Sequence, residues 1–308
     1  MLRAVGIPFQ RATYRELKFT YMRRRRTSTP TSSHRNYLKF GFVIITIFFG
    51  LLFLHQLRNS LFFSKRDRLN IIIYDRSPTF YSYGMVDKVH YRGVFDSEMT
   101  VLIPGGYGKY KIKSLGELAR LEKNPKLVSK AFSSLTSTSI DYYFYPKSFK
   151  SVHAKFTLLT YASNANFLDR VFISLISFNK KTNDFSLINF NTFSYTKKNT
   201  IEEHFFKKYQ GYFYQKNLRE ENKNIQIVYN NHSSISTISR ILEGEGIRVV
   251  DLSYSENINK GCKIIRNKKS EYTEKYLNLH FNCIISTGDT GGQDMIVELG
   301  SEVEKEWE

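Results

Sequence analysis

The amino-acid sequence predicts an α/β protein that follows a single membrane-spanning helix. Residues 40–54 form a long apolar run without a charged side chain, which is typical of a membrane span. After this run, short apolar stretches typical of buried strands alternate with segments of helical spacing. Residues 224–308 repeat this alternation in a regular order, which indicates a small domain with helices packed on a sheet.

The apolar run fits a bilayer in its length and in its flanks. Extended to residues 37–57, it has about 20 residues, enough to cross about 30 Å of hydrocarbon. Four arginines, residues 23–26, lie on its N-terminal side. The positive-inside rule therefore places a basic tail, residues 1–36, in the cytoplasm and the part of the chain after Arg58 outside the cell membrane. A cleaved signal peptide is disfavoured because the run is long and no small-residue cleavage site follows it.

The positive charge is spread unevenly along the chain. The formal net charge is +18, and residues 1–39 hold ten Lys and Arg against one acid, Glu16. The head thus carries +9 and the remaining 269 residues carry the other +9. Membrane topology and attraction to anionic lipid explain this basic head, while a nucleic-acid-binding arm is the less favoured alternative. With 41% apolar residues, the chain is not a disordered one.

Residues 58–215 are expected to form the first exported domain. Apolar runs predict three of its strands: residues 69–75, 99–104 and 140–145. Ser114 is expected to cap one helix, and Pro125 suits the first turn of the next. Apolar side chains at helical spacing predict a further helix at residues 167–176, with a strand as the alternative because many of them are β-branched or aromatic. Thr200 and Glu203 form a capping box.

Residues 224–308 are expected to form the second exported domain, after a polar linker at residues 216–223. Its pattern gives the order β-α-β-β-α-β-β, a two-layer arrangement with the helices on one face of the sheet. The expected strands are residues 225–230, 247–254, 261–267, 282–286 and 294–300, and the expected helices are residues 233–246 and 270–281.

The two cysteines of the chain, Cys262 and Cys283, both lie at predicted strand ends. Outside the cytosol such a pair favours a disulfide, which the chain-entropy model values at about 3 kcal/mol for this loop length. Two buried free thiols are the alternative. No Cys or His partners stand at ligand spacing, so we expect no metal site here.

Four short stretches of the second domain follow one another in a recognisable order: "IQIVYNN", "SRIL", "GEGIRVVDL" and "DMIVELG". In these stretches the domain resembles the C-terminal domain of LytR/CpsA/Psr (LCP) cell-envelope proteins of bacteria. One departure is clear, because the glycines expected after the first Asn are replaced by Asn231, Ser233 and Ser234.

The first domain contains the stretches "RLNIIIYD", "MTVLIPGGYGKYKI" and "IDYYFY". In these stretches it resembles a shortened, divergent catalytic domain of the same family. In active members, the resemblance implies transfer of a glycopolymer from a polyprenyl-pyrophosphate carrier to peptidoglycan, with arginines on the pyrophosphate, carboxylates holding a divalent metal and an apolar groove for the lipid. An Arg-Asp pair normally follows the Ile-Pro. Here Gly105 and Gly106 stand in its place.

Two groups of residues are candidates for what remains of this chemistry. Lys109, Lys111 and Lys113 would form a basic, phosphate-binding stripe if the segment is extended, since alternate residues of a strand share a face; a solvated strand face is the blander interpretation. The other candidates for phosphate or metal binding are Asp75, Arg76, Arg92 and Asp96. A strand-end turn explains the first two equally well, and a hairpin surface explains the last two.

The resulting prediction is a single-pass envelope protein that binds or scaffolds cell-wall material without catalysis and needs no cofactor. Its expected partners are the lipid bilayer and either peptidoglycan or a polyprenyl-linked glycopolymer. The first alternative is a metal-dependent glycopolymer phosphotransferase, the one case in which Mg²⁺ would be required. The second is a nucleic-acid-binding membrane protein.

Overall fold

The computed structural model describes residues 32–308 except residues 59, 64–65, 76, 147–156 and 191–200. The first element is a long helix, α1 (Ser32–Arg58). Within it, residues 39–58 are long and apolar enough to cross a membrane. Residues 54–308 form one compact unit, and the earlier part of α1 belongs to another.

The N-terminal half of the compact unit is built on a mixed sheet with the strand order β7-β6-β1-β2-β3-β8. Its strands are β1 (Arg68–Ile73), β2 (Thr79–Gly84), β3 (His90–Val94), β6 (Tyr142–Tyr145), β7 (Ala162–Ser163) and β8 (Phe185–Asn189). β1 runs antiparallel to β2 and parallel to β6, and β3 runs parallel to β8. The predicted strands at residues 69–75 and 140–145 correspond to β1 and β6.

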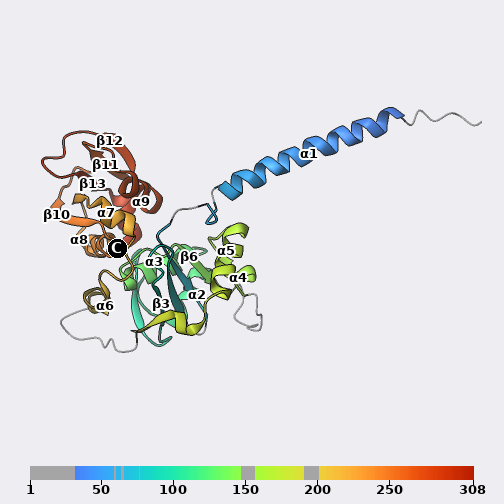
Figure 1. The fold of residues 1–308 in the computed structure, drawn as a ribbon. Helices are drawn as coiled ribbons and strands as arrows, with labels where there is room; N and C mark the ends of the chain where they lie inside the picture. The colour runs from blue at the N-terminus through green and yellow to red at the C-terminus, as the bar shows by residue number, and fades with distance from the viewer. Residues whose placement is uncertain (1–31, 59, 64–65, 76, 147–156, 191–200) are drawn as a thin grey trace, which may run out of the picture. The chain divides into compact units, whose positions relative to one another are not determined.

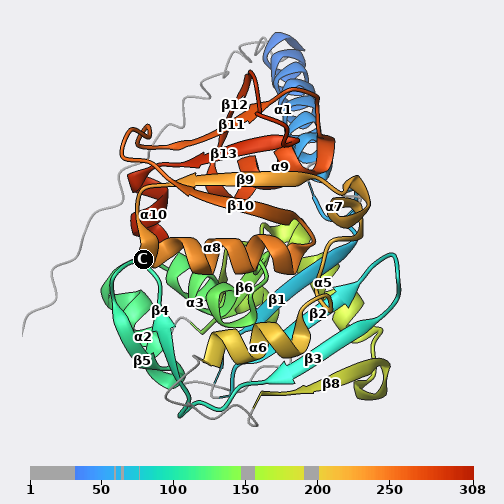
Figure 2. The same ribbon diagram turned by 90° about the vertical axis from the view of Figure 1, so that its left-hand side faces the viewer.

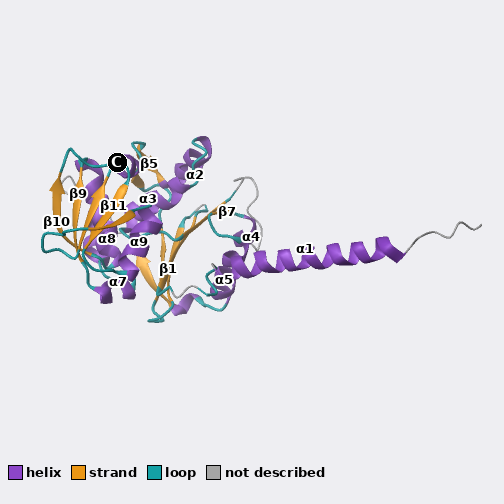
Figure 3. Ribbon diagram, turned by 90° about the horizontal axis from the view of Figure 1, so that it is seen from above, coloured by secondary structure: helices purple, strands orange, loops and turns teal. Residues whose placement is uncertain are grey.

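Helices cover both faces of this sheet (Figures 1 and 3). One face, which includes Ile72 and Phe80, packs on α2 (Ile112–Leu121), α3 (Lys126–Thr136) and α6 (Ile201–Tyr209). The opposite face, which includes Ile71 and Tyr83, packs on α4 (Thr157–Thr160) and α5 (Phe167–Phe178). The alternation of side chains along β1 and β2 thus places two separate apolar clusters on the two faces.

The glycine-rich stretch after the Ile-Pro forms a separate hairpin of β4 (Thr100–Ile103) and β5 (Gly108–Lys111). α2 follows β5 directly, and the expected cap at Ser114 is wrong because this residue lies inside the helix. The N–H groups of Ile112 and Lys113 instead donate to the carbonyls of Met99 and Ser97. Pro125 is the N-cap of α3, and the helix expected at residues 167–176 is α5. Thr200 of the expected capping box lies outside the described residues.

The C-terminal half contains a five-stranded sheet with the order β10-β9-β13-β11-β12. Its elements follow the predicted order: β9 (Asn224–Tyr229), α8 (His232–Glu245), β10 (Arg248–Tyr254), β11 (Cys262–Arg266), α9 (Glu271–Phe281), β12 (Ile284–Thr287) and β13 (Met295–Leu299). Alternate residues of β9 and β13 are buried, as expected for a sheet with one covered face. Figure 2 shows α8 along that face, next to α3.

Two helices in this half are absent from the sequence prediction. α7 (Lys216–Glu221) lies where a linker is predicted. Its Leu218 is buried in the C-terminal core, and the carboxylate of Glu221 accepts the N–H of Thr273 at the start of α9, at 2.8 Å. α10 (Ser301–Trp307) follows β13. The division of residues 58–308 into two domains stays a prediction, since residues 54–308 cluster as one unit.

A buried carboxyl group joins the two halves at the C-terminal end of α8. Glu245 has no exposed surface, and its Oε1 accepts the hydroxyl of Thr138 at 2.5 Å and the N–H of Ser139 at 2.6 Å. Its Oε2 has no hydrogen-bond partner in the described part of the chain. Burial therefore raises the pKa of Glu245 to about 8, because an unpaired buried charge is costly.

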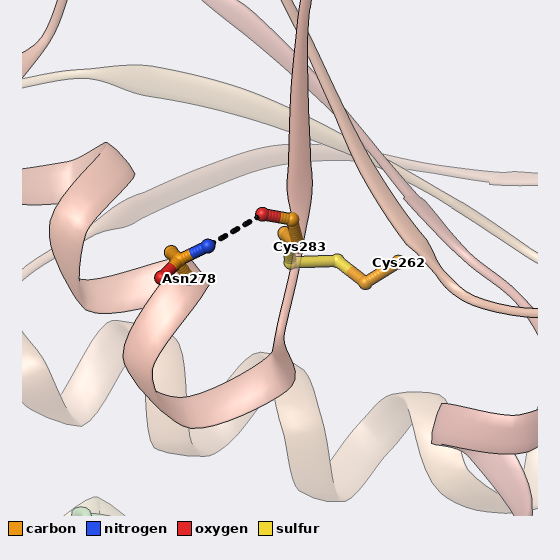
Figure 4. Close-up of a disulfide and its surroundings, with 3 residues drawn as sticks. All are labelled: Cys262, Asn278 and Cys283. Carbon is orange, nitrogen blue, oxygen red and sulfur yellow. Dashed lines mark hydrogen bonds between the residues drawn. A yellow bond between two sulfur atoms is a disulfide. The ribbon is translucent and has the colours of Figure 1, made fainter.

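The structure joins Cys262 and Cys283 in a disulfide (Figure 4). Cys262 opens β11, Cys283 directly precedes β12, and both are buried. The side-chain amide of Asn278 donates to the carbonyl oxygen of Cys283 at 2.9 Å and fixes the end of α9 there. The bridge therefore links the starts of two neighbouring parallel strands.

Removal of this bridge is expected to weaken the C-terminal half. The variant carrying Cys262→Ser and Cys283→Ser should unfold with a free energy about 3 kcal/mol lower, since the bridge closes a loop with a sequence separation of 21. Urea titration followed by the fluorescence of Trp307 measures the change. The wild-type protein under reducing conditions should match the double variant, and an unchanged midpoint in both would contradict the prediction.

Glu245 should make stability depend on pH. Its folded-state pKa of about 8 lies above the ordinary value of 4.5, so the folded protein retains a proton that the unfolded chain releases. Stability should therefore fall as the pH rises from 5 to 8, by at most about 1.4 kcal/mol per pH unit. Glu245→Gln should remove this slope while keeping an acceptor for Thr138. If the free energy of unfolding changes with pH in the same way for the variant and the wild type, Glu245 does not titrate in this range and the prediction is wrong.

Candidate functional site

A groove of about 620 Å³ lies between α5 and the sheet face that this helix covers. Such a volume falls within the range of small-molecule sites. Most of its walls are apolar or aromatic, and two cations, Arg92 and Lys180, lie among them. The full lining consists of Ile73, Tyr81, Tyr83, Arg92, Leu158, Leu159, Val171, Ser174, Leu175, Ser177, Phe178, Lys180, Thr182 and Phe185.

Strand register brings the floor of the groove together. Tyr81 of β2 pairs with Ile71 of β1 on one side and with Arg92 of β3 on the other. Arg92 in turn pairs with Leu187 of β8. Residues that pair directly across neighbouring strands point to the same face. The groove floor on this face takes one or more side chains from each of the four strands, among them Ile73, Tyr81, Arg92 and Phe185. Val171, Leu175 and Phe178 supply the opposite wall at helical spacing.

Arg92 is the sequence candidate that lies in this groove. Its guanidinium carbon is 5.9 Å from the centroid of the Tyr81 ring, within the range of a cation–π contact. Its Nε is buried and has no hydrogen-bond partner in the part of the chain that the structure describes. A donor left unpaired in this way favours an anionic or carbonyl oxygen as its partner.

Two further polar residues on the same face are neutral at ordinary pH. His90 is 5% exposed, and neither of its ring nitrogens has a partner among the described residues. Burial lowers its pKa, and the positive charges of Lys180 and Arg68 lower it further. Tyr83 contacts Ser177 at 2.9 Å between the two hydroxyl oxygens, and burial raises its pKa to about 12. Arg92 and Lys180 therefore dominate the charge of the groove.

The other charged candidates lie elsewhere. Asp75 lies beside Tyr161, where burial and then the Asp75 charge raise the pKa of the tyrosine. Asp96 is exposed beyond the end of β3, and its carboxylate accepts the N–H of Glu98 at 2.9 Å. Neither is part of the groove lining. Arg76 lies outside the described residues.

The three lysines do not form an extended stripe. Lys109 lies in β5 and has an interaction partner of its own. Lys111 ends β5, and Lys113 lies in α2. The ammonium groups of Lys111 and Lys113 both pair with the carboxylate of Glu98, at 2.9 and 2.6 Å. Glu98 compensates part of the positive charge of Lys111 and Lys113. This position is therefore less favourable for binding a phosphate.

The glycines of the same stretch form a turn that contacts the C-terminal residue. Gly105, Gly106 and Gly108 all have positive φ, at 96°, 78° and 82°, which glycine adopts without strain. The N–H groups of Gly105 and Gly106 donate to the backbone oxygen of Glu308 at 3.0 and 3.3 Å. The amide donors that suggest a phosphate loop are thus bound within the protein.

A buried carboxylate fixes the helix that forms one wall of the groove. Asp169 lies in the first turn of α5, and its own N–H donates to the side chain of Asn166, the N-cap, at 2.8 Å. Its two carboxylate oxygens accept the N–H of Leu61 at 2.7 Å and the hydroxyl of Tyr142 at 3.1 Å. The start of α5 is therefore tied to the sheet and to the residues that directly follow α1.

A second cavity, of about 370 Å³, lies next to this carboxylate, between α3 and the C-terminal helices. Arg66 forms an ion pair with Asp141 on its wall. Burial raises the pKa of Asp141 although the guanidinium opposes the shift. Lys130 pairs with Glu306 at 2.5 Å and lies 5.5 Å from the Trp307 ring. Arg66 and Lys130, two of the cations in this cavity, are each paired with an acid, so it is a less favourable site for a charged ligand than the groove.

Comparison with known proteins gives only partial matches. No protein-family model and no curated protein matches the chain. Among solved structures, TagT of Bacillus subtilis shares 15% identity over 26% of this chain and 32% of that one, with a TM-score of 0.22. TagT bound to LIIa-WTA gives 16% identity over 26% and 32%, with a TM-score of 0.23. A LytR-CPS2A-psr family protein, YwtF (TagT), with bound octaprenyl pyrophosphate lipid gives 12% over 48% and 90%, with a TM-score of 0.29.

These solved structures come from the family that the sequence motifs resemble. The matched part of this chain spans about a third of the length of the two TagT structures. All three TM-scores are below 0.5.

Loss of the Asp169 carboxylate should loosen α5. Asp169→Ala would leave a buried N–H and a buried hydroxyl without an acceptor, and should lower the free energy of unfolding by about 2–4 kcal/mol. Asp169→Asn keeps an acceptor for Leu61 and should cost less. Chemical denaturation measures both variants, and hydrogen exchange should show faster exchange in α5 for the alanine variant. Equal stability of both variants and the wild type would contradict this role.

Proposed function

We propose that this chain is a single-pass envelope protein that binds a polyprenyl-linked glycopolymer through its lipid carrier and does not transfer the polymer. In this proposal the basic N-terminal tail is cytoplasmic and residues 59–308 face the cell wall. The observation that supports it most directly is the apolar groove beneath α5 with Arg92 among its walls.

The groove suits an amphiphile that carries an anionic group. Its aromatic and aliphatic walls favour a hydrocarbon chain through the burial of apolar surface. Arg92 and Lys180 favour a phosphate, and an arginine with an unpaired N–H is suited to charge-assisted hydrogen bonds with phosphate oxygens. A polyprenyl phosphate or pyrophosphate combines these two features in one molecule.

Binding without transfer is supported by the distribution of the charged residues. Phosphoryl transfer needs several cations and a metal held by acids around one phosphate group. Asp75 and Asp96 lie outside the groove lining. No group of three or more His, Cys, Asp or Glu residues that could hold a metal occurs within the described ranges. The residues that line the groove do not fit a Mg²⁺ site. The proposed binding of the lipid carrier involves no metal.

The second candidate is the glycopolymer phosphotransferase, and the observation that favours it is the unpaired Nε of Arg92. Both functions require the same lipid carrier, so binding alone does not separate them. Incubation of the full chain with a polyprenyl-pyrophosphate-linked glycan, with peptidoglycan and with Mg²⁺ does so. Our proposal expects the glycan to stay on its carrier. Release of the carrier with attachment of the glycan to peptidoglycan would establish the transferase.

Arg92→Ala is expected to weaken binding of the full chain to farnesyl pyrophosphate in detergent by about 10- to 100-fold, the loss of a charge-assisted hydrogen bond of about 1.5–3 kcal/mol. Binding of farnesol, which lacks the phosphates, should not change. Isothermal titration calorimetry measures both ligands.

Two further variants control this experiment. Ser174→Trp places an indole in the groove and should weaken both ligands. Lys113→Ala removes a cation that pairs with Glu98 outside the groove, and it should bind both ligands as the wild type does. If Arg92→Ala binds farnesyl pyrophosphate with wild-type affinity, the phosphates do not bind at this position and the proposal fails.

A further inference from the structure

One side of α5, called its outer side below, carries residues that line the groove and also exposes large apolar side chains. Phe167, Leu175 and Phe178 are 70%, 51% and 90% exposed, and with Val171 they follow one another at spacings of three or four residues. The inner side of the same helix buries Ile173 completely. Such a helix is apolar on two sides, which is unusual for a surface helix in water and marks an interaction surface.

The segment directly after α1 extends this surface. Phe62 and Phe63 are 42% and 63% exposed. The ring of Phe62 packs edge-on against Phe172 of α5, with the ring centroids 5.1 Å apart. The exposed aromatic rings of residues 62–63 and of α5 therefore belong to neighbouring segments.

Covalent geometry keeps this surface near the end of the membrane span. The apolar helix ends at Arg58, and the N–H of Leu61 is bound to Asp169 in the first turn of α5. Three residues of extended chain reach at most about 11 Å. The headgroup layer on one side of a bilayer is about 5–8 Å thick. Whatever direction α1 takes, the start of α5 cannot lie far from the lipid headgroups.

The charges of α5 agree with a lipid surface as the partner. The only cation inside the helix, Arg170, donates to the backbone carbonyl oxygens of Ala165 and Tyr161 at 3.0 and 2.7 Å. The only acid, Asp169, is buried and bound. Lys180 and Lys181 follow the end of the helix, where they can reach anionic headgroups. The exposed side of α5 therefore presents apolar groups flanked by positive charge, the pattern of an interfacial helix.

We propose that the outer side of α5, together with Phe62 and Phe63, inserts into the headgroup–acyl boundary of the leaflet from which α1 emerges. Val171, Leu175 and Phe178 also line the groove, so this contact opens the groove to the bilayer itself. An amphiphilic ligand then enters sideways from the leaflet without crossing water. The inference rests on membrane anchoring by α1 and holds whichever ligand occupies the groove.

Depth-resolved fluorescence quenching tests this contact in the full chain. The protein is reconstituted into nanodiscs of phosphatidylcholine and phosphatidylglycerol, with or without bromine atoms on the upper part of the acyl chains. Phe167→Trp and Phe178→Trp place a reporter at each end of α5. Leu121→Trp is the matched control, since Leu121 is 65% exposed at the end of a helix on the opposite face of the sheet. The wild type, whose one tryptophan is Trp307, supplies the background signal.

The proposal expects brominated lipid to quench the reporters at 167 and 178 and to leave the reporter at 121 unchanged. Absence of quenching at both α5 positions would overturn it. Equal quenching at all three positions would also overturn it, because the contact would then not be specific to α5. Reporters on α5 that are shielded from aqueous iodide and not quenched by brominated lipid would indicate a protein partner and overturn it as well. None of these outcomes depends on the binding of farnesyl pyrophosphate in detergent.

Discussion

The hydrogen bonds of the Asp169 carboxylate are the constraint on which the candidate site depends. One oxygen binds the N–H of Leu61, shortly after the apolar helix α1, and the other binds the hydroxyl of Tyr142, the first residue of β6. Because Asp169 lies in the first turn of α5, these two bonds fix the helix over one face of the sheet and so create the groove beneath it. The bond to Leu61 also holds the start of α5 close to the end of the apolar helix, which lies three residues earlier at Arg58. The position of α5 on the sheet, the groove beneath it and the proposed membrane contact therefore all depend on the buried carboxylate of Asp169.

Buried acids recur as bridges between distant parts of this basic chain. Asp141 accepts the N–H of Asn70, Glu245 accepts that of Ser139, and Glu304 accepts those of Asn230 and Asn231. Each pairs with backbone donors far away in sequence that would otherwise be buried without an acceptor. The net charge of +18 therefore does not describe the interior, where carboxyl groups join several distant segments.

Local sequence patterns predicted a large part of the fold and little of the site. Apolar spacing predicted the order of the elements from β9 to β13 and the helix α5. The positions of the two cysteines, Cys262 and Cys283, predicted their disulfide. Local patterns did not predict the groove, because its floor is formed by strands that lie far apart in the sequence and pair with one another in the sheet. β3 pairs with β8, and Arg92 thereby lies opposite Leu187, a register that no short pattern encodes. The polar segment at Lys216–Glu221 is a helix because Leu218 finds a distant core.

The two faces of the N-terminal sheet separate the two places where phosphate chemistry was expected. The glycine turn at Gly105 and Gly106 belongs to the side of the sheet covered by α2 and α3, and its N–H groups bind the oxygen of Glu308. Arg92 belongs to the side covered by α5, where its Nε is unpaired among the described residues and the walls are apolar. A lipid-linked ligand needs an apolar channel next to its phosphate and a path from the bilayer. The α5 side combines an apolar groove, a cation and a hydrogen bond to Leu61, which follows the end of the apolar helix by three residues. The proposed lipid phosphate is therefore better accommodated there than at the glycine turn.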